Sequence, residues 1–398
     1  MIIGLIGKPN TGKSTFFNAA TLKNVPTGNY PFTTINPNIG ITHIKVKCPC
    51  KELDIKDEPV NSKCIDGFRF IPVEIVDIAG LVPDASKGKG LGNQFLDNIR
   101  MADVLIHVID TSGSTDKEGK TIEIGSHNPI EDIKFVREEF NIWLKSIIDR
   151  HWTSIVRSAK NNDQLYDMLS EKLIGIGVKK TQILESVQKT QLINIKPIEW
   201  KDNNLQDFIS TLQSITKPII IAANKIDVNT SKTYISELKK SGLEINPCAA
   251  EAELLLKLAS DKKIIDYSPG DNVFKVNSDK INIKQNRALE LIKKILEQNG
   301  STGIQNIINK AYLEILNCIV VYPVEDENKL CDKKNRVLPD AHILKKGSTA
   351  KDLAYKIHTD IGKTFLYAIN ARLKIKISGK YELKNNDVIK IVSSTRKS

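Results

Sequence analysis

Hydrophobic residues in this chain gather in short runs that alternate with amphipathic stretches. Apolar runs bounded by polar, glycine or proline residues are predicted to be buried strands, at 1–6, 70–76, 104–110, 218–223 and 243–247. The segments between them favour helices, the first of which starts near Thr15. Strands that alternate with helices predict an α/β fold, in which a mostly parallel sheet carries helices on both faces.

The pattern changes at about 126–198, where strand-like runs vanish. Apolar residues there recur at helical spacing with charged residues between them: Ile133, Val136, Phe140, Trp143, Leu144, Ile147 and Ile148. We therefore expect a helical insertion, in the form of a helical hairpin, inside an α/β domain that spans 1–317. Residues 318–398 are expected to form a second domain.

The turn after the first apolar run has the spacing of a phosphate-binding loop, or P-loop. Residues 7–14 read Gly-Lys-Pro-Asn-Thr-Gly-Lys-Ser, between a predicted strand and a predicted helix. The two glycines let successive N–H groups point inward, and the helix adds the positive end of its dipole. Lys13 would reach the β- and γ-phosphates, and the Ser14 hydroxyl would hold Mg²⁺. Further nucleotide contacts are expected from Asn10, Thr11, Gly12 and Thr15.

Three further motifs follow in the order that a nucleotide site requires. The strand at 70–76 ends in Asp77-Ile78-Ala79-Gly80, where the carboxylate could hold Mg²⁺ through water and the Gly80 N–H could meet the γ-phosphate. The strand at 218–223 runs into Asn-Lys-Ile-Asp at 224–227, and the last strand runs into a small-residue turn at Cys248. Residues 224–227 taken alone also fit a polar turn after a strand, but the order of the motifs favours a nucleotide site.

Asp227 would select the base in this arrangement. Its carboxylate can accept hydrogen bonds from the ring N–H and the exocyclic amine of guanine, whereas adenine would leave a desolvated carboxylate unpaired. Asn224 would brace the loop and touch the purine, and the Lys225 stem would cover one ring face. The N–H of Ala249 or Ala250 would meet the guanine oxygen. Guanine nucleotides are therefore the predicted ligands.

Together these motifs resemble the Obg-like GTPases, in the archaeal form of their YchF-type branch. The resemblance covers nearly the whole chain, with switch I at 29–38, switch II at 77–82 and 88–96, and a TGS-like module at 338–392. It implies a P-loop NTPase G domain, a C-terminal β-grasp TGS domain, and Mg²⁺-dependent GTP hydrolysis as a molecular switch. Many YchF-type proteins carry Asn-x-x-Glu and prefer ATP. Because this chain has Asp227, GTP is the prediction and ATP the alternative.

The candidate catalytic groups are His107 and a potassium ion held by Asn10. Leu81 follows Asp-x-Ala-Gly, where many small GTPases place a glutamine that orients the attacking water. His107 resembles the catalytic histidine proposed for the family, and the alternative is a core histidine. Asn10 sits where related GTPases hold K⁺ beside the phosphates, and the alternative is a side chain that braces the loop. In switch I, either Thr33 or Thr34 would close on Mg²⁺, and the sequence does not separate them.

The surplus of positive charge lies near the carboxy terminus. The chain carries 58 Lys and Arg against 47 Asp and Glu, and residues 329–398 alone hold 17 against 6. A basic module attracts nucleic-acid phosphates, so the ribosome or ribosomal RNA is the expected partner, in line with the resemblance. A lysine-rich solvated surface is the alternative. A nucleotide-bound RNA adaptor without turnover is the alternative to an enzyme.

The composition indicates a multidomain cytoplasmic protein with substantial cores. The chain has 398 residues, of which 40% are hydrophobic, and it shows neither an apolar run of membrane-spanning length nor a signal-peptide pattern. Its six cysteines are therefore expected to be free thiols. Cys48, Cys50 and Cys64 lie in one polar insertion and would suit a three-thiolate metal site, but their spacing reveals no fourth ligand nearby.

Overall fold

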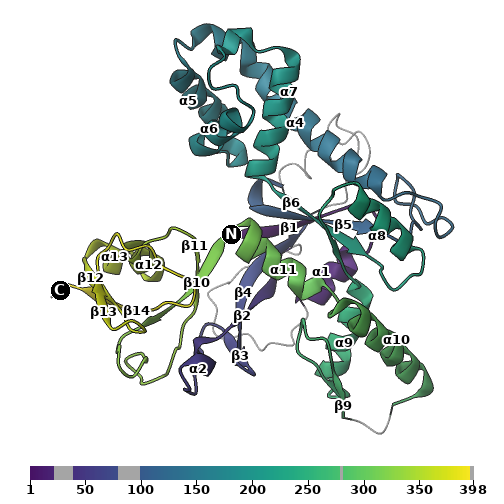
Figure 1. The fold of residues 1–398 in the computed structure, drawn as a ribbon, viewed down its shortest axis with the longest axis vertical. Helices are drawn as coiled ribbons and strands as arrows, with labels where there is room; N and C mark the ends of the chain where they lie inside the picture. The colour runs from purple at the N-terminus through teal and green to yellow at the C-terminus, as the bar shows by residue number, and fades with distance from the viewer. Residues whose placement is uncertain (22–38, 79–98, 278–280, 395–398) are drawn as a thin grey trace. The chain divides into compact units, whose positions relative to one another are not determined.

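The computed structural model of the chain describes residues 1–21, 39–78, 99–277 and 281–394 (Figure 1). The expected switch I, most of switch II, and with them Thr33, Thr34 and Gly80, lie outside these residues. The chain forms two compact units. The first unit consists mainly of residues 1–20 and 74–307, and the second of residues 41–73 and 308–398. Residues 41–73 thus group with the carboxy-terminal part of the chain, which the sequence did not indicate.

The main sheet is mostly parallel, as predicted. Within the described residues its strands follow the order β2 (Ile39–Lys47), β4 (Phe68–Asp77), β1 (Ile2–Ile6), β5 (Val104–Asp110), β6 (Ile219–Asn224) and β7 (Ile245–Pro247), with β3 (Lys63–Ile65) paired to β4. The pairs from β4 to β7 are all parallel. Every residue of β5 is buried, as its unbroken apolar run suggests. The carboxyl ends of β4, β1, β5 and β6 therefore meet at one edge of the sheet.

The helices of the first unit pack on this sheet and on one another. They include α1 (Lys13–Thr21), α8 (Ser231–Lys240), α9 (Ala250–Asp261), α10 (Ile283–Asn299) and the first half of α11 (Ile304–Lys310). Leu238 of α8 shares a core with Ile109 and Ile221 of the sheet, while Leu256 of α9 packs with Ile292 of α10. These contacts establish the predicted α/β architecture.

The predicted helical insertion contains α4 (Ile130–Ser158), α5 (Asn162–Leu173) and α6 (Lys180–Lys189). A further helix, α7 (Asp202–Thr216), contributes Leu205 and Phe208 to the same core, and the rings of Trp152 and Trp200 lie 5.4 Å apart. The helical group therefore reaches residue 216, beyond the expected boundary near 198. The apolar stripe of α7 is visible in the sequence, but the sequence does not show that α7 packs against the insertion helices.

The carboxy-terminal module is a mixed sheet with helices. Its strand order is β11 (His342–Lys345), β10 (Cys318–Val324), β14 (Val388–Ser393), β12 (Phe365–Asn370) and β13 (Ile375–Ile377). Only β10 and β14 pair in parallel, and α12 (Ala350–Ile357) places Leu353 in a core with Val321 and Ile389. The short helix α13 (Thr359–Lys363) follows. This arrangement is the expected β-grasp. None of the helices in the described residues is long and apolar enough to span a bilayer.

Candidate nucleotide-binding site

The predicted P-loop joins β1 to α1 in a conformation that requires glycine at two positions. Gly7 and Gly12 have φ values of 153° and 90°. A Cβ atom on Gly7 would come within 2.6 Å of the Val108 carbonyl oxygen, and one on Gly12 within 2.2 Å of Asn224 Nδ2. The loop therefore passes directly against β5 and against Asn224, the last residue of β6.

Lys13 and Asp77 meet beside this loop. The parallel register sets Asp77, the last residue of β4, opposite Leu5 of β1. The Lys13 ammonium group forms an ion pair with the Asp77 carboxylate. Ser14, the next residue of α1, is exposed. The structure thus brings Lys13 and Asp77 together, and Ser14 follows Lys13 in the first turn of α1.

Asn224 connects the P-loop to the turn after β7. Its Nδ2 donates to the Thr11 carbonyl oxygen at 2.9 Å, and its Oδ1 accepts from the Ala250 N–H at 3.0 Å. The side chain is buried, so both bonds are shielded from water. One amide therefore holds two sequence-distant loops in a fixed relation.

The N–H groups of the turn after β7 are already engaged. Ala249 donates to the Thr302 carbonyl oxygen at 2.9 Å, and Ala250 donates to Asn224. A guanine oxygen would consequently have to share the Ala250 N–H. Sequence reasoning missed the segment at 301–303, where a Cβ on Gly303 would lie 2.1 Å from the Pro247 carbonyl oxygen. The available signal was the Ser-Thr-Gly sequence at 301–303, which lies between α10 and α11.

Lys225 is held by a buried carboxylate that sequence reasoning also missed. Its Nζ donates to Asp110 Oδ2 at 2.9 Å and to Ser114 Oγ at 3.2 Å. Burial by itself would raise the pKa of Asp110, but the hydrogen bonds from Ser112 and Lys225 outweigh it and hold this pKa below its ordinary value. The sequence signal that could have revealed Asp110 is its position at the carboxyl end of a fully buried strand.

Asp227 lies in the turn after β6 with an exposed side chain. Burial raises the pKa of the Cys248 thiol, and the negative charge of Asp227 raises it further. The Ile226 N–H donates to the Cys248 carbonyl oxygen, and the Cys248 N–H donates to Ala223. Folding therefore brings Asp227 next to the turn with which it would share a base.

His107 is buried in the middle of β5, in register with Ile6 and Ile221. Burial lowers its pKa to about 3, and the positive charges of Arg137 and Lys8 act in the same direction. The imidazole is therefore neutral at physiological pH. These surroundings favour the core interpretation, and a part for His107 in hydrolysis stays a prediction.

Asn10 ties the P-loop to the segment that precedes α4, and Lys8 ties it to α4 itself. The Asn10 amide donates to the Gly119 carbonyl oxygen at 2.9 Å, from a backbone with φ of 63° that asparagine tolerates. Lys8 forms a buried ion pair with Asp132 of α4 at 2.8 Å, and His127 Nε2 lies 2.9 Å from the same carboxylate. Asn10 thus braces the loop, and a potassium ligand at this position stays a prediction.

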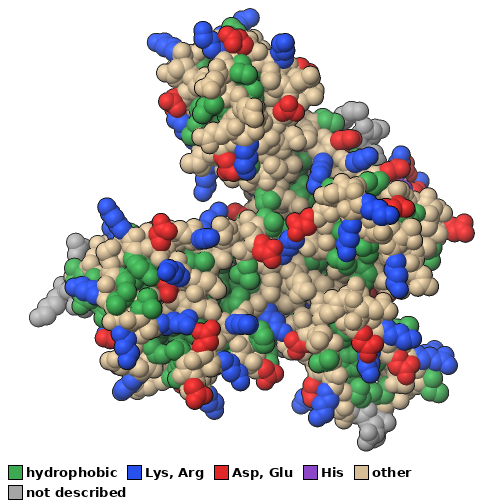
Figure 2. Space-filling view, viewed as in Figure 1, with side chains coloured by type: hydrophobic (Ala, Val, Ile, Leu, Met, Phe, Trp, Pro, Cys, Tyr) green, Lys and Arg blue, Asp and Glu red, His purple; other side chains and the backbone are tan. Residues whose placement is uncertain are grey.

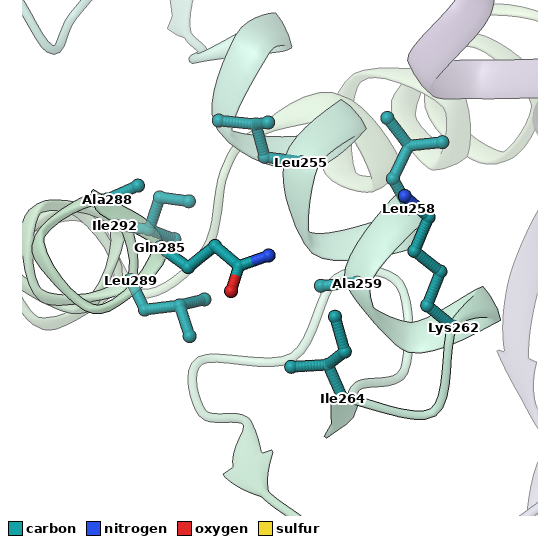
Figure 3. Close-up of a pocket in the computed structure, with 9 residues that line it drawn as sticks. All are labelled: Leu255, Leu258, Ala259, Lys262, Ile264, Gln285, Ala288, Leu289 and Ile292. Atoms are coloured by element: carbon teal, nitrogen blue, oxygen red, sulfur yellow. The ribbon is translucent and has the colours of Figure 1, made fainter. Parts of the chain in front are cut away.

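A separate apolar hollow lies between α9 and α10 (Figure 3). Its volume is about 190 Å³, and Leu258, Leu289 and Ile292 line it together with the stem of Lys262. Its lining shares no residue with the nucleotide site and offers no cluster of donors for phosphate. The site is therefore defined by the P-loop and its neighbours rather than by this hollow.

The fold and the site define a P-loop NTPase with a carboxy-terminal β-grasp module. Three family models match the chain: 50S ribosome-binding GTPase at residues 2–137, Obg-like GTPase YGR210-like, G4 motif-containing domain at 222–326, and the TGS domain at 334–393. The chain belongs to the YchF-type branch of the Obg-like GTPase family, which confirms the resemblance seen in its motifs.

Similar proteins cover the chain over nearly its full length. An uncharacterized GTP-binding protein of Methanocaldococcus jannaschii is 48% identical over 99% of this chain and 100% of its own. The crystal structure of a GTP binding protein from Pyrococcus horikoshii is 38% identical, with a TM-score of 0.77 over 99% of this chain and 100% of its own. The ribosome-binding ATPase YchF of Bacillus subtilis is 29% identical over 92% of this chain and 87% of its own.

Proposed function

We propose that this protein binds GTP with Mg²⁺ and hydrolyses it to GDP as a molecular switch. The observation that carries the proposal is the double hydrogen bond of Asn224, which fixes the P-loop against the turn beside Asp227. The phosphate-binding and base-selecting parts of the chain are thereby held as one site. The GTP-binding relatives from Methanocaldococcus and Pyrococcus support the choice of nucleotide.

The described residues fit a Mg²⁺-nucleotide complex. Ser14 and Asp77 supply a hydroxyl and a carboxylate, the hard oxygen ligands that Mg²⁺ prefers, and Thr33 or Thr34 would add a second hydroxyl from switch I. Bound Mg²⁺ would neutralise charge on the β- and γ-phosphates. In the complex Lys13 would exchange its ion pair with Asp77 for the phosphates. The Gly80 N–H would meet the γ-phosphate, which gives switch II a means to sense it.

Turnover tests the enzymatic part of the proposal. Phosphate release from GTP, measured with Mg²⁺ and K⁺ and with purified ribosomes present, should be lost in Lys13→Ala. Lys293→Ala, on the exposed side of α10, is the matched control and should hydrolyse GTP normally. A wild-type chain that binds GTP without releasing phosphate under these conditions would instead be a nucleotide-bound adaptor. Equal rates in K⁺ and Na⁺ at fixed ionic strength would count against K⁺ at Asn10.

ATP is the second candidate substrate, for two specific reasons. The Bacillus subtilis relative is named a ribosome-binding ATPase. The Ala249 and Ala250 N–H groups, moreover, already have protein acceptors, which weakens one of the expected contacts to a guanine oxygen. The Asp227 carboxylate outweighs these two reasons. In guanine it can accept hydrogen bonds from two neighbouring donors, the ring N–H and the 2-amino group. Adenine has a single exocyclic amine, and that amine lies at another position on the ring.

The proposed site of action is the ribosome, reached in the cytoplasm through the basic carboxy-terminal module. Relatives named ribosome-binding support this partner. On the face in view, Lys and Arg side chains are spread over the module with acidic side chains between them (Figure 2). Lys376 lies 3.8 Å from the ring centroid of Tyr367, so a cation and an aromatic ring share one part of the β12–β13 pair.

A further inference from the structure

Four side chains of the kind that bind metal ions come together in the second unit. They are Cys48, Cys50, Asp57 and Cys64, and their sulfur and carboxylate ligand atoms all lie within 4.8 Å of one another. Cys48 and Cys50 are buried, while Asp57 and Cys64 are partly buried. Asp57 is the fourth ligand that the cysteine spacing alone did not reveal. We propose that these four residues bind one structural Zn²⁺ ion.

The distances within the cluster suit tetrahedral coordination. A zinc ion with Zn–S bonds of about 2.3 Å and Zn–O bonds of about 2.0 Å separates two sulfurs by about 3.8 Å, and a sulfur from an oxygen by about 3.5 Å. The Cys50 and Cys64 sulfurs lie 3.7 Å apart, and Cys48 Sγ lies 3.2 Å from Asp57 Oδ2. Small side-chain adjustments would therefore place all four atoms around one ion.

The backbone positions these ligands without help from a metal. Cys48 and Cys50 flank the start of the short helix α2 (Pro49–Glu52), and Cys64 lies in β3 of the β3–β4 hairpin. The Cys48 N–H donates to the carbonyl oxygen of Gly67, in the turn of that hairpin, at 2.9 Å. Gly67 has φ of 81°, which lets the hairpin turn tightly enough to reach Cys48. The helix start and the hairpin thus form two sides of a preorganised site.

Arg69 supplies the positive charge that such a site needs. Its side chain is fully buried, and its Nη2 donates to Asp57 Oδ2 at 2.8 Å and to Cys48 Sγ at 3.5 Å. Three thiolates and a carboxylate carry two more negative charges than Zn²⁺ neutralises, so an adjacent guanidinium lowers the cost of burying them. Groups that hydrogen-bond metal ligands also fix their orientation. Arg69 is therefore a positioning residue for two of the four ligands.

The donor set selects zinc over the metals of the nucleotide site. Thiolates are soft ligands that bind Zn²⁺ well and Mg²⁺ or Ca²⁺ poorly. Four protein ligands leave no open position for water or substrate, which is the pattern of a structural zinc site. The ion would secure the segment that carries Asp57, whose neighbours Glu58 and Val60 donate backbone hydrogen bonds to Val337 and Pro339.

Metal content of the full chain tests this proposal. The protein is purified under reducing conditions from cells supplied with zinc and without chelators, and its zinc is measured by mass spectrometry. We expect one equivalent in the wild type and at least a tenfold loss in Cys64→Ser. Cys331→Ser, which removes a buried thiol outside the cluster, is the matched control and should keep its zinc. A wild type with far less than one equivalent, or equal zinc in the two variants, would contradict the proposal.

Cobalt substitution tests the ligand set. Co²⁺ bound to the wild-type chain should give the intense visible bands of tetrahedral coordination and a thiolate charge-transfer band. Asp57→Ala should weaken Co²⁺ binding at least tenfold, whereas Asp57→Cys should retain it with a stronger charge-transfer band. A fully reduced wild-type chain without these bands would show that the cluster is only three thiols beside an Arg69–Asp57 ion pair, which overturns the proposal.

A third measurement needs no variant and so does not depend on how the substitutions fold. Stepwise modification of wild-type thiols should release zinc as Cys48, Cys50 and Cys64 react, identified by peptide mass spectrometry. Release that follows modification of Cys318 or Cys331 instead would contradict the assignment. A Cys50–Cys64 disulfide found by non-reducing alkylation of freshly isolated protein would overturn it as well.

Discussion

Asn224 Nδ2 occupies the space that a Cβ atom on Gly12 would need, because the two atoms would be only 2.2 Å apart. The second glycine of the P-loop therefore serves two purposes. It adopts a φ of 90°, and it admits the amide that ties the phosphate loop to the turn after β7. The loops proposed to bind phosphate and to select the base are therefore held together at this one close contact.

Gly12→Ala should weaken GTP binding about 100-fold and destabilise the chain by about 1–3 kcal/mol, since the added methyl group must displace Asn224. Gly347→Ala is a matched control, because Gly347 has φ of 86° but no atom within 4 Å of the position that an added methyl group would take. It should cost stability through backbone strain alone and leave GTP affinity unchanged. Calorimetric titration and urea unfolding measure the two effects. Equal GTP affinity in both variants would contradict the role given to the Asn224 contact.

Asp110→Asn should weaken GTP binding by roughly tenfold. The substitution removes the charge that holds Lys225, whose stem is expected to cover the purine, and charged hydrogen bonds of this kind contribute about 1.5–3 kcal/mol. Lys225→Met keeps most of the stem and should lose less affinity than Lys225→Ala. Fluorescence titration with a labelled guanine nucleotide checks this order. If Lys225→Met and Lys225→Ala bind equally, the stem does not cover the base.

The buried His107 should make folding stability depend on pH. Its folded pKa of about 3 lies below its ordinary value of 6.5, so below pH 6.5 the unfolded chain takes up a proton that the folded chain does not. This contribution to stability is present above pH 6.5 and is lost as the pH falls toward 3. Between pH 7 and pH 5 it amounts to about 2 kcal/mol.

Urea unfolding at these two pH values measures the effect. His107→Leu should lose less stability on acidification than the wild type. An unchanged pH dependence in His107→Leu would mean that the imidazole is not buried as described. Turnover of the same variant decides its other role, because a large loss with intact GTP affinity would support catalysis.

Ribosome binding should fall steeply with salt if the basic module provides the contact. Replacing Lys374 and Lys376 with Gln should weaken cosedimentation with ribosomes and flatten its salt dependence, because fewer counterions are released on binding. Lys239 and Lys240 in α8 offer a paired control outside the module. If the two double variants lose binding equally, or if binding does not respond to salt, then the module is only a solvated surface.

Local sequence patterns predicted the parts of the site that lie within single motifs. The P-loop glycines, the strand before Asp77 and the strand before Asn224 follow from composition and spacing. The helical insertion also follows, because its apolar residues recur at helical spacing. Each of these features is encoded within a few residues of itself.

Features that depend on distant segments could not be predicted in this way. The contact between Asp110 and Lys225 forms only because β5 pairs with β6, which brings the two residues together. Asp57 stands among charged residues in the sequence, and only the β3–β4 hairpin brings Cys64 to its side. A carboxylate at the end of a buried strand can be recognised in the sequence as a candidate functional residue. Its partner cannot, because the fold decides which distant residue lies next to it.

The most direct test of nucleotide selection by this site is the affinity of the full chain for GTP and ATP, each with Mg²⁺, before and after Asp227→Asn. Replacing the carboxylate with an amide substitutes a donor for an acceptor, so guanine should lose its partner and xanthine, which has an oxygen in place of the 2-amino group, should gain one. We predict that the wild type binds GTP at least 100-fold more tightly than ATP and that Asp227→Asn prefers the xanthine nucleotide. Near-equal affinities for GTP and ATP in the wild type would contradict base selection by Asp227.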